Sequence, residues 1–301
     1  DTFSSRGLGD VYKRQTFSVK KEDDLDKVEF GAKGFIGFYV GQQNYTIACS
    51  DENNILIRTV DDSDIAWYLW LTSETVSDIP SKDQFTNLIW SDEFDYTGAI
   101  DPDKWVHEVR EQWYNNELQS TTSSLENSKA EDGKLKITAI KKSNGDYTSA
   151  RIRTYKKLDF TYGRVDVKAK MPSKTKGVWP AIWLLGSNYE TIDWPACGEI
   201  DIQEYAHTNN FNVQSTVHQP EGYGGQGDSH TSNDYNSIDE EFHVYSLVWT
   251  KEALTFYVDD KPHHIVGNSC ALPFNWDFYL ILNFAMGGDM GGDVDSSFTS
   301  D

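Results

Sequence analysis

The chain has 301 residues, of which 14% are aromatic, and its formal net charge is −21. This length and aromatic content suffice for one large domain with a sizeable core and for part of another. An acidic surface repels phosphate backbones and anionic lipids, and no apolar run reaches the roughly 18 residues of a membrane span. We therefore expect neither a nucleic-acid partner nor insertion into a membrane.

The first part of the chain divides into three segments. Residues 1–15 contain the string GLGDVYKRQ, which resembles translated sequencing-adapter read-through, so we expect them to be non-native. Residues 16–72 contain four runs of β-branched and aromatic residues separated by polar turns, and they predict a partial accessory β-module. The runs are 35–40, 45–49, 54–60 and 65–71. Residues 73–86 are polar and aperiodic, which predicts a linker.

From residue 87 to residue 301 the pattern stays all-β. Runs that alternate between apolar and polar residues, as half-buried strands do, are 133–140, 162–171, 242–249 and 254–258. Residues 278–285 are almost continuously apolar, which predicts a buried central strand. Many strands without a long helical period indicate a sandwich or a barrel, in which long loops wall a cleft.

Three carboxylates fall within six residues of one predicted strand, Glu199-Ile-Asp-Ile-Gln-Glu204. Because side chains alternate along a strand, Glu199 and Asp201 share one face and Glu204 points to the other. A β-bulge near Ile202–Gln203 returns Glu204 to its fellow acids, and bulges are over-represented next to active sites. The spacing therefore predicts a bulge if the three acids act together.

Crowded carboxylates cannot all ionise freely, so at least one pKa is expected to rise. A protonated carboxyl can act as general acid while an ionised neighbour attacks, which is the division of labour in retaining glycoside hydrolysis. Trp179, Trp183 and Trp194 stand just upstream, and their faces can stack on sugar rings. The alternatives are that these rings pack in a core and that the acidic strand is a solvated edge.

The chain has three cysteines, Cys49, Cys197 and Cys270, without the spacing of a structural zinc site. Cys197 and Cys270 can pair in an oxidising compartment. Buried free thiols are the alternative, because cysteine packs as a small hydrophobe.

Over most of 87–298 the sequence resembles glycoside hydrolase family 16, in particular its laminarinase-like members. The segments that carry the resemblance are Trp90–Asp95, Asn115–Gln119, Asp132–Leu135, Ser149–Ile152, Tyr162–Arg164, Gly177–Gly186, Trp194–Glu204, Phe242–Tyr245 and Asn283–Gly288. The resemblance implies a β-jelly roll of two curved antiparallel sheets, the concave one forming a glycan-binding cleft. It also implies that 87–301 is a catalytic domain lacking the family's last strand.

The resemblance assigns roles by motif position. Glu199 matches the nucleophile, Glu204 the general acid/base, and Asp201 the residue that holds and tunes the nucleophile. The candidate substrate-binding residues are Asn115, Glu117, Trp179, Trp183, Trp194 and His218. Some members bind calcium away from catalysis, and Glu93 and the Gly133 carbonyl sit at comparable positions.

These observations predict a secreted, cell-surface or periplasmic endo-β-1,3-glucanase that acts as a monomer on laminarin-like β-glucan with retention of configuration. We expect no required cofactor, only a structural calcium ion as an option. The alternatives are a β-1,3-1,4-glucanase or an agar- or carrageenan-cleaving galactanase of the same family. A non-catalytic glucan-binding protein is the alternative from another class.

Overall fold

The computed structural model describes residues 84–235, 237–269 and 271–301 in full and, upstream of them, the backbone of five strands. The five are β1 (Thr2–Ser4), β2 (Thr16–Ser18), β3 (Tyr45–Ser50), β4 (Ile55–Val60) and β5 (Ile65–Tyr68). β1 pairs with β2, and β3, β4 and β5 form an antiparallel meander. The last three coincide with predicted strands, whereas the predicted strand 35–40 lies outside the described residues.

The chain divides into two compact units, of which the larger comprises 80–249, 255–266 and 276–301. Its first strands are β6 (Val106–His107), β7 (Gln119–Thr121), β8 (Ser128–Glu131), β9 (Lys134–Ile137), β10 (Ile140–Lys141), β11 (Tyr147–Ser149), β12 (Arg151–Arg153) and β13 (Gly163–Ala169). They are followed by β14 (Val178–Gly186), β15 (Glu199–Glu204), β16 (Val213–His218), β17 (Asp228–Ser232), β18 (His243–Trp249), β19 (Ala253–Val258), β20 (Lys261–Gly267) and β21 (Phe278–Met286), of which the start of β19 and the last residue of β20 fall in the smaller unit. The helices of this part are short: 3-10 turns at His207–Asn209 and Gly224–Gln226, and α1 (Gly288–Gly291).

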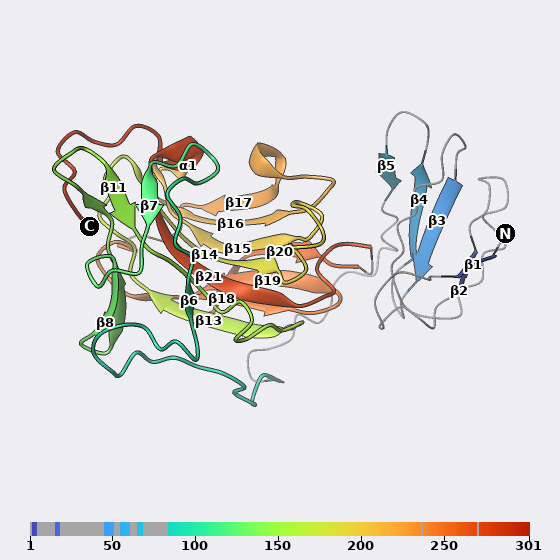
Figure 1. The fold of residues 1–301 in the computed structure, drawn as a ribbon. Coiled ribbons are helices and arrows are strands. Elements are labelled where there is room, and N and C mark those ends of the chain that lie inside the picture. The colour runs from blue at the N-terminus through green and yellow to red at the C-terminus, as the bar shows by residue number, and fades with distance from the viewer. Residues whose placement is uncertain are drawn as a thin grey trace. The chain divides into compact units, whose positions relative to one another are not determined.

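Two larger sheets form the body of this unit (Figure 1). One has seven strands in the order β17-β16-β15-β14-β21-β12-β6, and the other has four in the order β13-β18-β19-β20. Neighbouring strands of the seven-stranded sheet pair antiparallel. The predicted all-β sandwich is confirmed, and the nearly continuous apolar run 278–285 is a central strand, β21, between β14 and β12.

The core between the two sheets is aromatic and aliphatic. Trp249 of β18 is almost fully buried and packs edge-on against Phe278 of β21 at 5.2 Å between ring centroids. The rings of Phe160 and Tyr162, just before β13, contact Trp249 as well. Burying several large rings in one cluster supplies a large share of the hydrophobic stabilisation of a sandwich.

A proline lies inside β14, a central strand, where a missing N–H group normally breaks a ladder. The Pro180 carbonyl accepts a hydrogen bond from the Tyr205 N–H, one residue beyond the end of β15. A strand residue directs its N–H and C=O to the same side, so the absent donor also falls beyond the end of β15. The proline therefore leaves the regular pairing of β15 intact.

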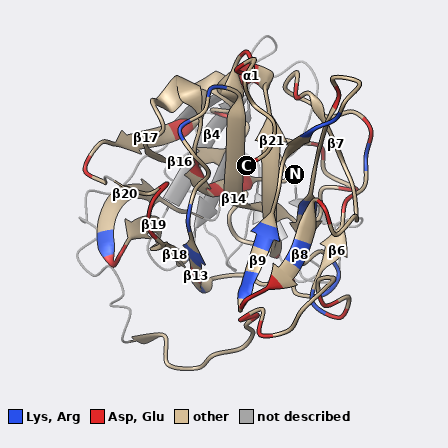
Figure 2. Cartoon of the chain, turned by 90° about the vertical axis from the view of Figure 1, so that its left-hand side faces the viewer, with Lys and Arg blue, Asp and Glu red and all other residues tan. Residues whose placement is uncertain are grey.

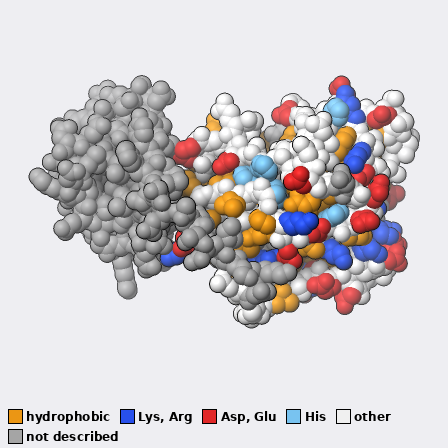
Figure 3. All heavy atoms as spheres, turned by 180° about the vertical axis from the view of Figure 1, so that it is seen from behind, with side chains coloured by type: hydrophobic (Ala, Val, Ile, Leu, Met, Phe, Trp, Pro, Cys, Tyr) orange, Lys and Arg blue, Asp and Glu red, His pale blue; other side chains and the backbone are white. Residues whose placement is uncertain are grey.

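Charges are dispersed over the described surface. The β8–β9 hairpin carries both basic and acidic positions (Figure 2). Their side chains form local ion pairs such as Lys136–Glu131 at 2.7 Å. On the face seen from behind Figure 1, Lys and Arg side chains are likewise interspersed with Asp and Glu (Figure 3). None of the described helices has the length and apolar character needed to cross a membrane.

Candidate active site

The three carboxylates lie on β15, whose pairing contains the predicted bulge. Between Asp201 and Glu204, β15 runs through two residues where the facing strand β16 has one, Ser215. Against β14 the register shifts at the same place, and Ile202 is passed over. One inserted residue reverses the alternation, so Glu204 returns to the face of Glu199 and Asp201. The predicted bulge is confirmed.

Apolar side chains anchor this strand from behind. Ile200 and Ile202 are essentially fully buried in the core. Asp201 and Glu204 are also buried, only 3% and 8% exposed, beneath the surrounding loops and rings. A strand held by two core isoleucines therefore presents its acids in a site largely shielded from bulk water.

Each acid has a nitrogen partner. The indole N–H of Trp194 donates to Glu199 Oε2 at 2.8 Å, and that of Trp179 donates to Glu204 Oε1 at 3.1 Å. His218 Nε2 lies 3.1 Å from Asp201 Oδ2 and 3.7 Å from Glu199 Oε1. The structure thus brings together these predicted site residues around one group of carboxylates.

Burial raises the pKa of all three carboxyl groups. The pKa of Glu199 rises to about 8, and the charge of Asp201 adds to the effect of burial while His218 opposes it. The pKa of Asp201 is raised well above its usual range by burial and by the charge of Glu204, although a hydrogen bond with Glu199 acts in the other direction. Burial also raises the pKa of Glu204, whereas His218 and the hydrogen bond from the Trp179 N–H lower it. The cluster therefore retains protons near neutral pH, and the Glu199–Asp201 hydrogen bond requires a proton on one of the two.

Two predicted substrate-binding residues, Asn115 and Glu117, lie on a loop that the β21–α1 segment holds. The Asp289 N–H donates to the Asn115 carbonyl at 2.9 Å. Gly288 has φ +72°, and a Cβ there would lie 2.8 Å from the Asn115 carbonyl oxygen and 3.1 Å from the Trp179 ring. The absence of a side chain at Gly288 thus allows the loop to pack beside Trp179.

Burial raises the pKa of Glu117, while the Gln119 amide that donates to it at 2.6 Å opposes the effect. The charge of Arg151 also lowers the pKa of Glu117. A partly buried acid beside Trp179 extends the polar lining of the site away from β15.

The ring of Trp183 forms part of a stack that was not predicted. The Arg151 guanidinium lies 4.5 Å from the Trp183 ring and 4.6 Å from the Trp113 ring, so it is stacked between them. Trp183 Nε1 donates to Asn283 Oδ1 at 2.6 Å, and Arg151 pairs with Glu108 at 2.9 Å. The ring is therefore fixed from both sides, and Arg151 also lowers the pKa of Glu199.

A second exposed ring stands beside Trp194. Trp194 is 44% exposed, and Tyr223, 50% exposed, contacts it edge-on at 5.3 Å between centroids. The loop that carries Tyr223 approaches His218 closely, because a Cβ on Gly227 would lie 2.8 Å from His218 Nδ1. An exposed aromatic pair next to buried acids suits the apolar face of a sugar ring.

The proposed calcium ligands are not part of this cluster. Glu93 and Gly133 are both exposed, and they supply two oxygen donors where calcium takes six to eight. Among the described residues, the His, Cys, Asp and Glu groups close enough to share a cation are Glu199, Asp201 and His218, all of which belong to the acid cluster. The described donors do not complete a calcium site, and its presence stays a prediction.

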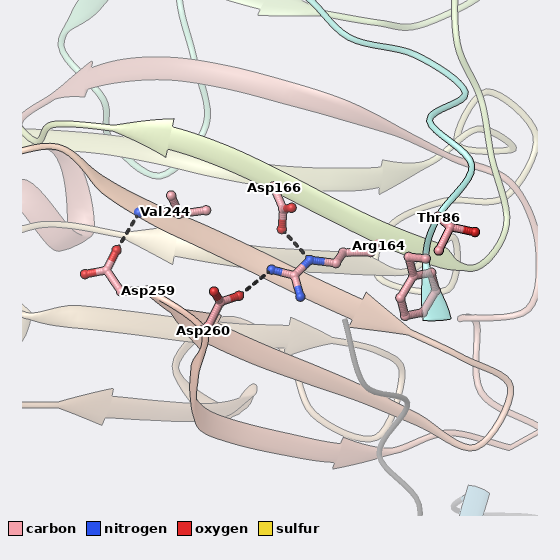
Figure 4. A pocket seen from close by; sticks show the side chains of 7 residues that line it. Thr86, Arg164, Asp166, Val244, Asp259 and Asp260 are labelled. Carbon is pink, nitrogen blue, oxygen red and sulfur yellow. Dashed lines mark hydrogen bonds and ion pairs between the residues drawn. The ribbon is translucent and has the colours of Figure 1, made fainter. Parts of the chain in front are cut away.

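A cavity of about 680 Å³ lies away from the acids, on the four-stranded sheet (Figure 4). The Arg164 guanidinium is its main polar group and donates to Asp166 at 2.7 Å and to Asp260 at 2.9 Å. Because these ion pairs engage the Arg164 guanidinium within the protein, it does not make the cavity a site for an anionic ligand.

Cys197 is a free, fully buried thiol just before β15. Burial and the charge of Glu199 raise its pKa to about 12. Such a thiol is unreactive, because the nucleophile is the thiolate. Cys270 lies outside the described residues.

Comparisons with known proteins identify the family. The family model for glycosyl hydrolases family 16 matches residues 111–294. The chain is 37% identical to a beta-glucanase of Rhodothermus marinus, over 72% of this chain and 81% of that protein. The catalytic domain LamAcat of Zobellia galactanivorans has a similar structure, with 41% identity, a TM-score of 0.65, and coverage of 73% of this chain and 95% of that one.

A variant of the same Zobellia galactanivorans protein, LamA_E269S, was solved with laminaritriose and laminaritetraose. It is 41% identical, with a TM-score of 0.64, over 72% of this chain and 95% of that one. Sequence match, identity and fold agree, and the two-sheet sandwich is the jelly roll implied by the sequence. The chain belongs to glycosyl hydrolases family 16.

Proposed function

We propose that the chain is an endo-acting β-1,3-glucanase that hydrolyses laminarin-like glucan with retention of configuration. The observation that carries the proposal is the bulge, which places Glu204 on the same face as Glu199 and Asp201. Similarity to proteins named beta-glucanase, and to one solved with laminaritriose, supports the glucan as substrate. A polymeric substrate also favours action outside the cytoplasm.

The mechanism assigns one role to each acid. Glu204 protonates the glycosidic oxygen as the bond to C1 breaks, while a Glu199 carboxylate oxygen attacks C1 and forms a glycosyl ester. Water then attacks C1 and gives its proton to Glu204, and Glu199 leaves as a carboxylate. The two inversions retain the configuration at C1.

Asp201 makes this division of labour possible. Its pKa is raised well above the usual range, and it shares a hydrogen bond with Glu199. We assign the shared proton to Asp201, because Glu199 also accepts the Trp194 N–H at 2.8 Å, which favours its ionised form. A protonated Asp201 leaves Glu199 ionised for attack and can withdraw its hydrogen bond as the ester forms.

The test compares hydrolysis of laminarin, lichenan and agarose by reducing-end release, with the first-formed anomer followed by NMR. Rapid shortening of laminarin with the β-anomer formed first is the expected result. Glu199→Gln and Glu204→Gln should each remove most turnover without changing the fold. Normal turnover in either variant contradicts the assignment, and laminarin binding without any release of reducing ends favours the glucan-binding alternative.

A further inference from the structure

The bulge that creates the site also removes regular ladder bonds between β15 and β16. Asp201 pairs regularly with Thr216 and Glu204 with Gln214, but the register shifts over the residues between them. Buried backbone groups without partners are strongly destabilising, so side chains or water must replace the lost bonds.

Ser215 replaces one of these bonds from the facing strand. Its hydroxyl donates to the carbonyl of the bulged residue, Ile202, at 2.8 Å. Ser215 is fully buried and Ile202 is 1% exposed, so water has little access to that carbonyl. Ser215 is therefore the group in the described structure that bonds the extra residue from the β16 side.

A histidine fixes the direction of that hydroxyl. His263 Nε2 lies 3.1 Å from Ser215 Oγ. A serine hydroxyl has one hydrogen, which goes to the Ile202 carbonyl, so Nε2 must carry the proton and donate to Ser215. The hydrogen bonds then run in one direction, from β20 through Ser215 to the bulge.

Gln203 replaces a second bond. Its side-chain Oε1 accepts from the Gln214 N–H at 3.2 Å. Gln214 is only partly buried, so water can substitute for this acceptor. The Ser215 hydrogen bond is therefore the less replaceable of the two.

We infer that Ser215 is a positioning residue for the general acid/base Glu204, acting through the Ile202 carbonyl; this rests on the proposed function. Glu199 and Asp201 precede the bulge and keep regular pairing with β16, whereas the face to which Glu204 points depends on the bulge. Loss of the Ser215 hydroxyl should therefore disturb acid catalysis by Glu204 more than attack by Glu199.

The test separates these two steps by leaving group. Cleavage of laminarin needs general acid assistance, whereas an aryl β-1,3-glucooligosaccharide with a dinitrophenolate leaving group does not. In Ser215→Ala, kcat/KM for laminarin should fall about 10- to 100-fold, because small misplacement of a catalytic group is costly. For the aryl substrate kcat/KM should change less than about threefold, because it reports attack by Glu199.

Ser215→Thr keeps the hydroxyl and should recover laminarin activity. Ser215→Cys, nearly isosteric but a weak donor, makes the same comparison if the alanine variant does not fold. The matched control is Ser128→Ala. Ser128 lies on β8, is buried, and has its hydroxyl 2.7 Å from Nε2 of a histidine, His107 on β6. Both substrates should be cleaved normally by this control.

Equal losses on both substrates, or no loss on laminarin, would overturn the positioning role while leaving the proposed function intact. A wild-type chain that cleaves neither substrate would overturn both. Gln203→Met should have a smaller effect than Ser215→Ala, and the reverse order would also contradict the inference.

Discussion

Replacing one tryptophan tests how the protein controls the proton on Glu204. In Trp179→Phe the site keeps an aromatic ring but loses the N–H that donates to Glu204 at 3.1 Å. This hydrogen bond favours the ionised carboxylate and lowers its pKa, so its removal raises that pKa further. Glu204 should then stay protonated to higher pH.

The size of the effect follows from the geometry. A hydrogen bond to a charged group contributes about 1.5–3 kcal/mol, and 3.1 Å is at the long end of the range, so the lower figure applies. At 1.36 kcal/mol per pH unit this equals about one unit. The alkaline limb of the kcat/KM profile on laminarin, where the general acid loses its proton, should move upward by about that amount.

Trp194→Phe provides the matched comparison, because its N–H donates to Glu199 rather than to Glu204. Here the acid limb, where the nucleophile becomes ionised, should move upward. Trp194 is 44% exposed, so water partly replaces the lost donor and the shift should be smaller. Shifts of the same limb in both variants, or no shift in Trp179→Phe, would refute the assignment of roles.

Three further predictions concern stability and the substrate-binding loop. Because the folded-state pKa of Glu199 is raised from 4.5 to about 8, its burial destabilises the fold increasingly as pH rises through that window. The free energy of unfolding of Glu199→Gln should therefore exceed that of wild type at pH 8, by a few kcal/mol at most, and differ little from it at pH 4. Calorimetry at the two pH values measures this, and the opposite trend contradicts it. In Gly288→Ala the new Cβ would clash with the Asn115 carbonyl, and alanine is strained at the φ of +72°. The displaced loop should raise KM for laminarin severalfold, with a smaller change in kcat. Arg151→Met removes the nearer of the two arginines that pair with Glu108 and leaves Arg153 at 3.3 Å. It should cost about 1–3 kcal/mol in denaturant unfolding, whereas an unchanged midpoint would show that the Arg151–Glu108 pair contributes nothing.

The bulge could be predicted because it follows from the parity of a strand. Acids at 199, 201 and 204 cannot share a face of a regular strand, so their joint action requires one extra residue. The position of the buried isoleucines between them was predictable for the same reason. Local sequence alone carries this information.

The stack of Arg151 between Trp113 and Trp183 could not be predicted in the same way. Its members come from segments far apart in the chain, and their contact depends on which strands become neighbours in the sheet. Arg151 and Arg153 alternate with the buried Ile152, and this pattern indicates that both arginines lie on the same face of a strand. It did not show which rings that face would meet. Tyr223 was missed for a similar reason, because a loop places it beside Trp194.

The bulge also has a consequence for how related sequences are compared. A strand has only two sides, so the number of residues between the acids decides on which side the last one appears. In a relative with a one-residue deletion at Ile202, a regular strand would already put all three acids on one side, and no bulge would be needed. A single alignment gap at this position therefore does not mark such a relative as inactive. A relative that keeps the spacing of Asp201 and Glu204 depends on the bulge, because without it the last acid would face the hydrophobic interior.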